Sequence, residues 1–74
     1  MKKSLTIFGP SGSGKTRNAE ALRKHFGLNH IWDEGKAAPR SKPCAFDTLI
    51  LQVEQPDDLS NAIHIETALR LIGA

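Results

Sequence analysis

The feature that most constrains this chain is a glycine-rich stretch near its start, Gly9-Pro10-Ser11-Gly12-Ser13-Gly14-Lys15-Thr16. The stretch fits the pattern G-x-x-x-x-G-K-[ST]. The apolar run 5–8 ends where this stretch begins, and a helical pattern of apolar residues follows it. The sequence therefore predicts a buried strand, a tight loop and a helix in immediate succession.

The composition of this loop is that of an anion-binding site. Its three glycines lack a Cβ, so the main chain can come close to a bound group and direct several N–H groups into one concavity. The amino end of the following helix adds further N–H donors. Lys15 brings a positive charge to the β- and γ-phosphates of a nucleotide, and the hydroxyl of Thr16 suits Mg²⁺. The predicted phosphate-binding residues are Gly9, Pro10, Ser11, Gly12, Ser13, Gly14, Lys15, Thr16 and Arg17, with Lys15 as the predicted catalytic residue.

Composition narrows the class of protein. A chain of 74 residues with 39% hydrophobic and 24% charged residues has the make-up of one small globular domain, spanning 1–74, and not of a disordered chain. The net charge of +2 is too small to imply nucleic-acid binding by itself. The single cysteine, Cys44, allows no disulfide within the chain, and no apolar run has the length of a membrane span. These features predict a cytoplasmic protein.

The periodicity of apolar residues predicts alternating strands and helices along the chain. The segment 48–53 carries the strongest strand signal, and Gly27 is placed to end the first helix in a left-handed conformation. Two prolines within 39–43 argue against a long helix in the middle of the chain and favour a loop with at most one short turn. The predicted elements are a strand over 5–8, a helix from 14 or 15 to 26, a strand over 28–32, a loop over 35–45, a strand over 48–53 and a helix over 57–72.

The loop and this order of elements resemble the front half of a P-loop nucleoside-triphosphatase domain. The closest likeness is to the small kinase-like branch, similar to shikimate and adenylate-type kinases. The end of the first helix in those kinases resembles Phe26-Gly27-Leu28, and the acidic end of their second strand resembles Ile31-Trp32-Asp33-Glu34. Their Walker B strand resembles the segment from Leu49 to Glu54. The resemblance implies an α/β fold with a minimal three-stranded parallel sheet in the order 2-3-1 and flanking helices on opposite faces. It also implies Mg²⁺ with ATP, or with GTP as the second choice.

The metal site departs from the family pattern. Gln52 occupies the place at which the Walker B strand normally carries an aspartate, and a neutral amide holds the water shell of Mg²⁺ poorly. Glu54 or Asp33 therefore joins Thr16 as a predicted metal-site residue, and the alternative for Glu54 is a solvated turn position. Asp33 and Glu34 point to opposite sides of a strand, and Asp33 is the one expected to face the loop.

The resemblance also leaves gaps beyond the third strand. The sequence shows no fourth or fifth strand, so Lys36, Arg40 and Lys42 either supply the missing cationic contacts to phosphate or form a solvated loop. Trp32 either packs against the sheet or stacks on a nucleobase. If the strand at 5–8 lies at the sheet edge, it is expected to pair with a second copy or with a larger protein, and the last helix offers another docking surface.

Three functions follow from these features. The first is binding of a nucleoside triphosphate with Mg²⁺, with slow hydrolysis or phosphoryl transfer. The second is a non-catalytic module that binds phosphate or nucleotide and docks a protein. The third is an accessory protein of a phage or mobile element, for which no residue argues directly. Whether the chain is an enzyme is left open by the sequence.

Overall fold

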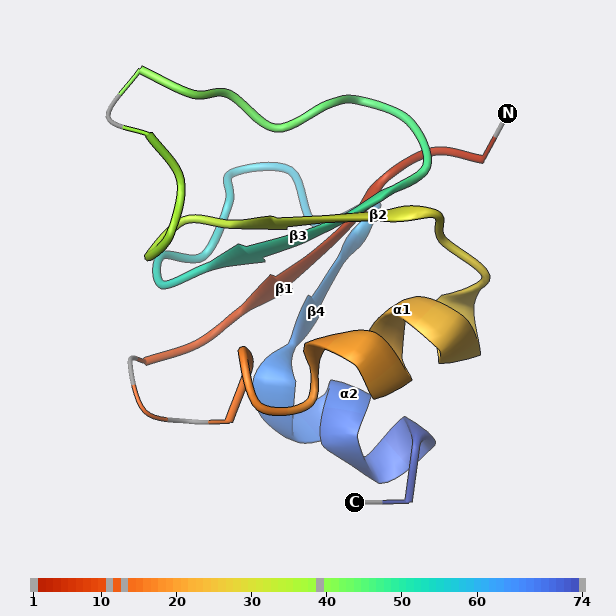
Figure 1. Cartoon of the computed structure of the whole chain (residues 1–74). Coiled ribbons are helices and arrows are strands. Elements are labelled where there is room, and N and C mark those ends of the chain that lie inside the picture. The colour runs from red at the N-terminus through yellow and green to blue at the C-terminus, as the bar shows by residue number, and fades with distance from the viewer. Residues whose placement is uncertain (1, 11, 13, 39, 74) are drawn as a thin grey trace.

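Four parallel strands form a single sheet in the order β2-β3-β1-β4, accompanied by two helices (Figure 1). The computed structural model describes residues 2–10, 12, 14–38 and 40–73. Neither of its helices is long and apolar enough to cross a membrane within these residues. The elements are β1 (Leu5–Phe8), α1 (Ala19–Phe26), β2 (His30–Asp33), β3 (Thr48–Gln52), β4 (Ala62–His64) and α2 (Ile65–Leu71).

The first three strands confirm the order 2-3-1 expected from the sequence, but the sheet has a fourth strand. Leu5 pairs with Leu49 of β3 on one side, and Ile7 pairs with Ile63 of β4 on the other. The expectation that β1 lies at the sheet edge is therefore wrong, because β4 covers that edge. The expected pairing of β1 with another chain required a free edge, and β1 has no free edge along the residues that pair with β3 and β4.

The predicted helix over 57–72 was wrong over its first half. Ile7 is fully buried, so its main-chain polar groups need partners on both sides, and β4 supplies those partners on one side. A local turn also opposes a helix here, because Asp58 accepts hydrogen bonds from the main-chain N–H and the hydroxyl of Ser60. Helical geometry begins only at Ile65 and runs to Leu71.

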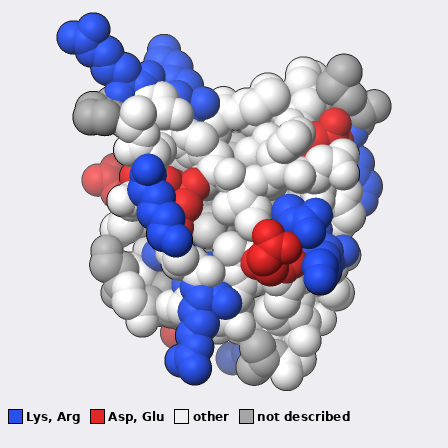
Figure 2. Space-filling view, viewed as in Figure 1, with Lys and Arg blue, Asp and Glu red and all other residues white. Residues whose placement is uncertain are grey.

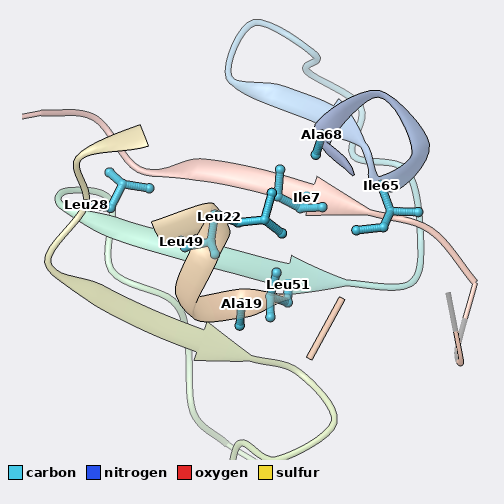
Figure 3. Packing of buried hydrophobic residues seen from close by; sticks show 8 residues of the cluster. All are labelled: Ile7, Ala19, Leu22, Leu28, Leu49, Leu51, Ile65 and Ala68. Atoms are coloured by element: carbon cyan, nitrogen blue, oxygen red, sulfur yellow. The ribbon is translucent and has the colours of Figure 1, made fainter. Parts of the chain in front are cut away.

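Both helices pack on the same face of the sheet, which corrects the expectation of opposite faces (Figures 1 and 3). Side chains from both helices belong to one buried cluster with side chains of the two central strands. Figure 3 shows Ile7 lying between the cluster residues of the two helices. The fully or nearly fully buried members are Ile7, Ala19, Leu22, Leu28, Leu49, Leu51, Ile65 and Ala68.

Loops, not helices, lie over the other face of the sheet (Figure 1). Phe8, Thr48 and Ile50 alternate with the core residues along their strands and point to this face, yet all three are buried. The segment between β2 and β3 is tied down at two places. Ser4 Oγ donates to the carbonyl oxygen of Cys44 at 2.7 Å, and Trp32 Nε1 donates to Ser41 Oγ at 2.9 Å. The predicted absence of a helix in this segment is confirmed for its described residues.

The first helix begins later than the sequence suggested. Residues 15–18 form turns, and α1 starts at Ala19 instead of at 14 or 15. The carbonyl oxygen of Gly14 accepts from both the main-chain N–H and the Nδ2 of Asn18, at 3.0 and 2.9 Å, and the N–H of Ala19 bonds to Thr16 in the tighter i to i−3 pattern. The predicted end is confirmed, because Gly27 adopts φ 68° and the N–H of Leu28 donates to the carbonyl oxygen of Arg23.

The start of α2 depends on an unusual cap. His64 Nδ1 accepts a hydrogen bond from the N–H of Glu66 at 3.1 Å, and the His64 ring meets Phe8 edge to face with centroids 5.4 Å apart. We expect His64→Ala to lower the free energy of unfolding by about 1–2 kcal/mol, measured by urea denaturation. His64→Asn keeps a capping acceptor and should lose less. Equal losses in the two variants would contradict a role for the cap.

The turn at Asp58, in the segment before β4, can be tested through the pKa of the Asp58 carboxyl. The Ser60 hydroxyl, at 2.6 Å, and the Ser60 N–H hold the pKa of the Asp58 carboxyl below its usual value, with a smaller contribution from the charge of Lys3. Because the pKa is lowered in the folded protein, ionised Asp58 favours this turn above its usual pKa. That contribution is lost as the pH falls through the lowered pKa.

We expect Ser60→Ala to raise the pKa of Asp58 toward its usual value in a carboxyl NMR titration. Ser60→Thr keeps the hydroxyl and should preserve the low pKa. An unchanged pKa in Ser60→Ala would show that the Ser60 hydroxyl does not stabilise the carboxylate.

Candidate functional site

The glycine-rich loop leaves the sheet directly from the end of β1. The N–H of Gly9 still donates to the carbonyl oxygen of Gln52 at 3.2 Å, after which the chain turns away from β3. Gly12 and Gly14 have φ of 77° and 94°, a region that side chains with a Cβ rarely adopt. The predicted binding residues Ser11 and Ser13 lie outside the described residues. Gly12 and Gly14 thus adopt backbone angles that favour glycine, as the sequence predicted.

Lys15 folds back over the beginning of the loop. Its Nζ donates hydrogen bonds to the carbonyl oxygens of Gly9 and Pro10, at 2.5 and 2.9 Å. Main-chain carbonyls thereby hold the ammonium group at the loop. Oxygen atoms of an anion are stronger acceptors for an ammonium group than neutral carbonyls, so a phosphate can compete for these donors.

The structure brings together two residues that lie 17 positions apart in the sequence, Thr16 and Asp33. Thr16 Oγ1 donates to Asp33 Oδ2 at 2.7 Å. The other carboxylate oxygen, Oδ1, accepts the N–H of Gly35 at 2.9 Å. Asp33 is the last residue of β2, and these two bonds fix its carboxylate against the loop. The sequence named Asp33 as one of two metal-site candidates, and the contribution of Gly35 was missed.

An open hollow of about 460 Å³ lies against the loop. It is framed by the loop, the end of β2 and the end of β3, whose carboxyl ends meet at the left of Figure 1. Ligands of open α/β sheets bind at this edge, beyond the carboxyl ends of the strands. The described lining residues are Gly12, Gly14, Lys15, Thr16, Arg17, Asp33, Glu34, Gly35, Leu51, Gln52 and Val53.

The other acidic candidates are placed less favourably. Glu54 is exposed and is not among the described residues that line the hollow, and its carbonyl oxygen accepts a hydrogen bond from Gln52 Nε2 at 2.7 Å. Glu34 does line the hollow, but its Oε1 is turned to the N–H of Val53 at 3.4 Å. Only Asp33 of these three carboxylates hydrogen-bonds to Thr16 within the described residues.

The donor set suits a cation that completes its shell with ligand and water oxygens. Among the described residues there is no group of three or more His, Cys, Asp or Glu side chains that could hold a metal by themselves. Mg²⁺ commonly binds through one or two protein oxygens together with substrate phosphates and water. Thr16 Oγ1 and the Asp33 carboxylate fit that mode of binding.

Some of the basic side chains lie at the same edge of the sheet. Figure 2 shows Lys and Arg at the upper left and down the left half of this face, on the side where Figure 1 places the carboxyl ends of β1, β2 and β3, with acidic side chains beside them and further basic side chains on the right. Lys36 lines a second hollow that adjoins the loop, whereas Arg40 and Lys42 are exposed and are not among the described lining residues of either hollow. Trp32 also lines the second hollow, and the sequence alone did not predict that this hollow exists.

The fold and the site define a small α/β domain with a parallel sheet in the order 2-3-1-4, two helices and a glycine-rich loop at the end of a central strand. No protein-family model, curated protein or solved structure matches the chain. The residues of the site are therefore the basis on which a function is assigned.

Proposed function

We propose that this protein binds the phosphates of a purine nucleoside triphosphate, ATP before GTP, together with Mg²⁺, as a minimal member of the P-loop nucleoside triphosphatases. The observation that carries the proposal is the hydrogen bond between Thr16 Oγ1 and Asp33 Oδ2, at 2.7 Å, beside an open hollow lined by the loop. A hydroxyl and a carboxylate at this separation can share one hydrated divalent cation.

Each group of the site has a defined task in this proposal. The loop N–H groups and Lys15 Nζ bind the phosphate oxygens, which replace the carbonyls of Gly9 and Pro10 as partners of the ammonium group. Thr16 and Asp33 hold Mg²⁺, directly or through water. The bound cation supplies charge neutralisation for the phosphates, and Lys15 stabilises negative charge that develops during phosphoryl transfer.

The test is a titration of the protein with ATP and Mg²⁺, followed by calorimetry and by amide NMR shifts. We expect a saturable heat and shifts of the Gly12, Gly14, Lys15 and Thr16 amides at up to millimolar ATP, with GTP as a comparison. A titration with neither heat nor shifts in these amides would refute nucleotide binding.

A second candidate is a nucleotide-binding module that does not catalyse a reaction. Gln52 favours it, because a neutral amide stands where the Walker B strand normally carries a carboxylate, and its Nε2 is bonded to the carbonyl oxygen of Glu54. Release of radiolabelled phosphate from ATP separates the two functions. Sustained release that depends on Lys15 would reject the non-catalytic module, and binding without release would support it.

The carboxylate of Asp33 should determine the Mg²⁺ dependence of binding. We expect Asp33→Asn to lower Mg²⁺ affinity in the nucleotide complex by about 10- to 100-fold, because the amide keeps an acceptor for Thr16 but loses the charge. The measurement is a Mg²⁺ titration at constant ATP. Glu54→Gln is the matched control, because Glu54 lies outside the described lining of the hollow, and it should leave Mg²⁺ affinity unchanged. A larger loss of Mg²⁺ affinity in Glu54→Gln than in Asp33→Asn would instead assign the metal site to Glu54.

A further inference from the structure

A second hollow adjoins the glycine-rich loop, and apart from Thr16 and Asp33 none of its described lining residues has a task in the function proposed above. It also has a volume of about 460 Å³, and it shares Thr16, Arg17 and Asp33 with the first hollow. Its remaining walls come from the start of α1, from β2 and from the segment after β2. Ligand pockets in proteins commonly have volumes of 300–1,000 Å³, so this hollow is large enough for a small molecule.

The charged side chains that line the second hollow differ in whether the protein itself provides them with a partner. Glu20 is paired with Arg23 at 2.9 Å, and both carboxylate oxygens of Asp33 accept hydrogen bonds. The side chains of Arg17 and Lys36 make no hydrogen bond or ion pair within the residues that the structure describes. Arg23 thus neutralises Glu20, whereas Asp33 keeps its negative charge because its two donors are uncharged. Two cations against one uncompensated carboxylate leave the lining with a positive charge that favours an anion from solution.

The wall between these charges contains apolar surface. Ile31 and Trp32 of β2, with Ala19 and Ala37, line the hollow. Trp32 is half-buried, and its Nε1 is bonded to Ser41 Oγ at 2.9 Å, which holds the indole under the segment after β2. A ligand that contacts this wall gains from burial of an apolar body as well as from its charge.

We propose that the second hollow binds a small organic anion, a phosphate or a carboxylate with an apolar body, through Arg17 and Lys36 and against Trp32. This ligand is separate from the nucleotide. Its binding does not depend on Lys15, which lines only the first hollow.

Trp32 provides the readout, because it is the only tryptophan and the chain has no tyrosine. We would titrate the protein with phenyl phosphate and record tryptophan emission, with benzoate to compare a carboxylate and with phenol and inorganic phosphate to separate the apolar and anionic parts. The expected result is a saturable change with phenyl phosphate that is retained in Lys15→Ala. Phenol and inorganic phosphate should each bind more weakly.

The variants test the two cations directly. Arg17→Gln combined with Lys36→Gln should weaken phenyl phosphate binding about tenfold, the combined effect of two exposed charge contacts. Lys24→Gln combined with Arg70→Gln removes the same charges from exposed positions outside both hollows and should leave binding unchanged.

Three results would overturn the second site. They are the absence of a saturable emission change, loss of the change in Lys15→Ala, and equal weakening in the two double variants. Loss in Lys15→Ala would assign the signal to the phosphate loop. Retention in Lys15→Ala would keep the second site even if ATP and Mg²⁺ fail to bind, so the two proposals can fail separately.

Discussion

Replacing Lys15 with alanine is expected to weaken binding of ATP with Mg²⁺ by roughly 10- to 150-fold, the range for loss of a hydrogen-bonded charge contact of about 1.5–3 kcal/mol. In the free protein Lys15 Nζ is held by the carbonyl oxygens of Gly9 and Pro10. The ammonium group is therefore already positioned at the loop, and little conformational entropy is lost when phosphate replaces the carbonyls. Calorimetry at fixed Mg²⁺ measures the change in affinity.

Lys24→Ala is the matched control for this experiment. Lys24 is an exposed residue of α1 that lines neither described hollow, so its loss changes the net charge equally without touching the site. Its affinity for ATP should remain close to that of the unmodified protein. Similar losses in Lys15→Ala and Lys24→Ala would show that only the overall charge matters, which would exclude a specific phosphate loop.

The largest expected effect on stability comes from Ile65, the residue at which β4 passes into α2. Its side chain is 1% exposed and belongs to the core cluster with Ile7 and Ala68. Truncating a buried isoleucine to alanine costs about 2–5 kcal/mol, because the burial is lost and a cavity remains. A chain of this size has a free energy of unfolding of roughly 4–11 kcal/mol. We therefore expect Ile65→Ala to lose a large share of its stability in urea denaturation followed by tryptophan emission.

Leu71→Ala is the corresponding control in the same helix. Leu71 is 51% exposed, so its truncation should cost well under half as much as that of Ile65. Ile65→Val removes a single methyl group and should lie between them, at about 0.5–1.5 kcal/mol, which gives a measurable value even if Ile65→Ala fails to fold. Equal costs for Ile65→Ala and Leu71→Ala would contradict the packing of α2 against the sheet.

The sequence predicted those parts of the fold that are set by local signals. The strand at 5–8, the strand core at 48–52 and the end of the first helix at Gly27 all depend on neighbouring residues, and all are present. The strand at 62–64 depends instead on pairing with β1, which is distant in the sequence. Its residues satisfy the hydrogen bonds of buried β1, while their own apolar spacing also suits a helix. No local pattern distinguishes these alternatives.

The candidate site was predictable to a similar degree. The loop motif identified Lys15 and Thr16, and the position of Asp33 at a strand end made it one of two metal candidates. The choice between Asp33 and Glu54 required the positions of β2 and β3 relative to the loop. The second hollow could not be predicted from the sequence, because it forms where the segment after β2 returns toward α1. That return follows from tertiary packing and not from any motif.

The pairing of β1 has a consequence for how the chain folds. Strand β1, which precedes the glycine-rich loop, is translated before its two neighbours, and these begin at Thr48 and Ala62. Parallel pairings between such distant segments require large loops to close before any contact compensates for the lost entropy, and they are typical of slower folding. The sheet on both sides of β1 can therefore be complete only after the residues of β4 have been synthesised. Nascent chains that end before Ala62 should lack a completed sheet around β1.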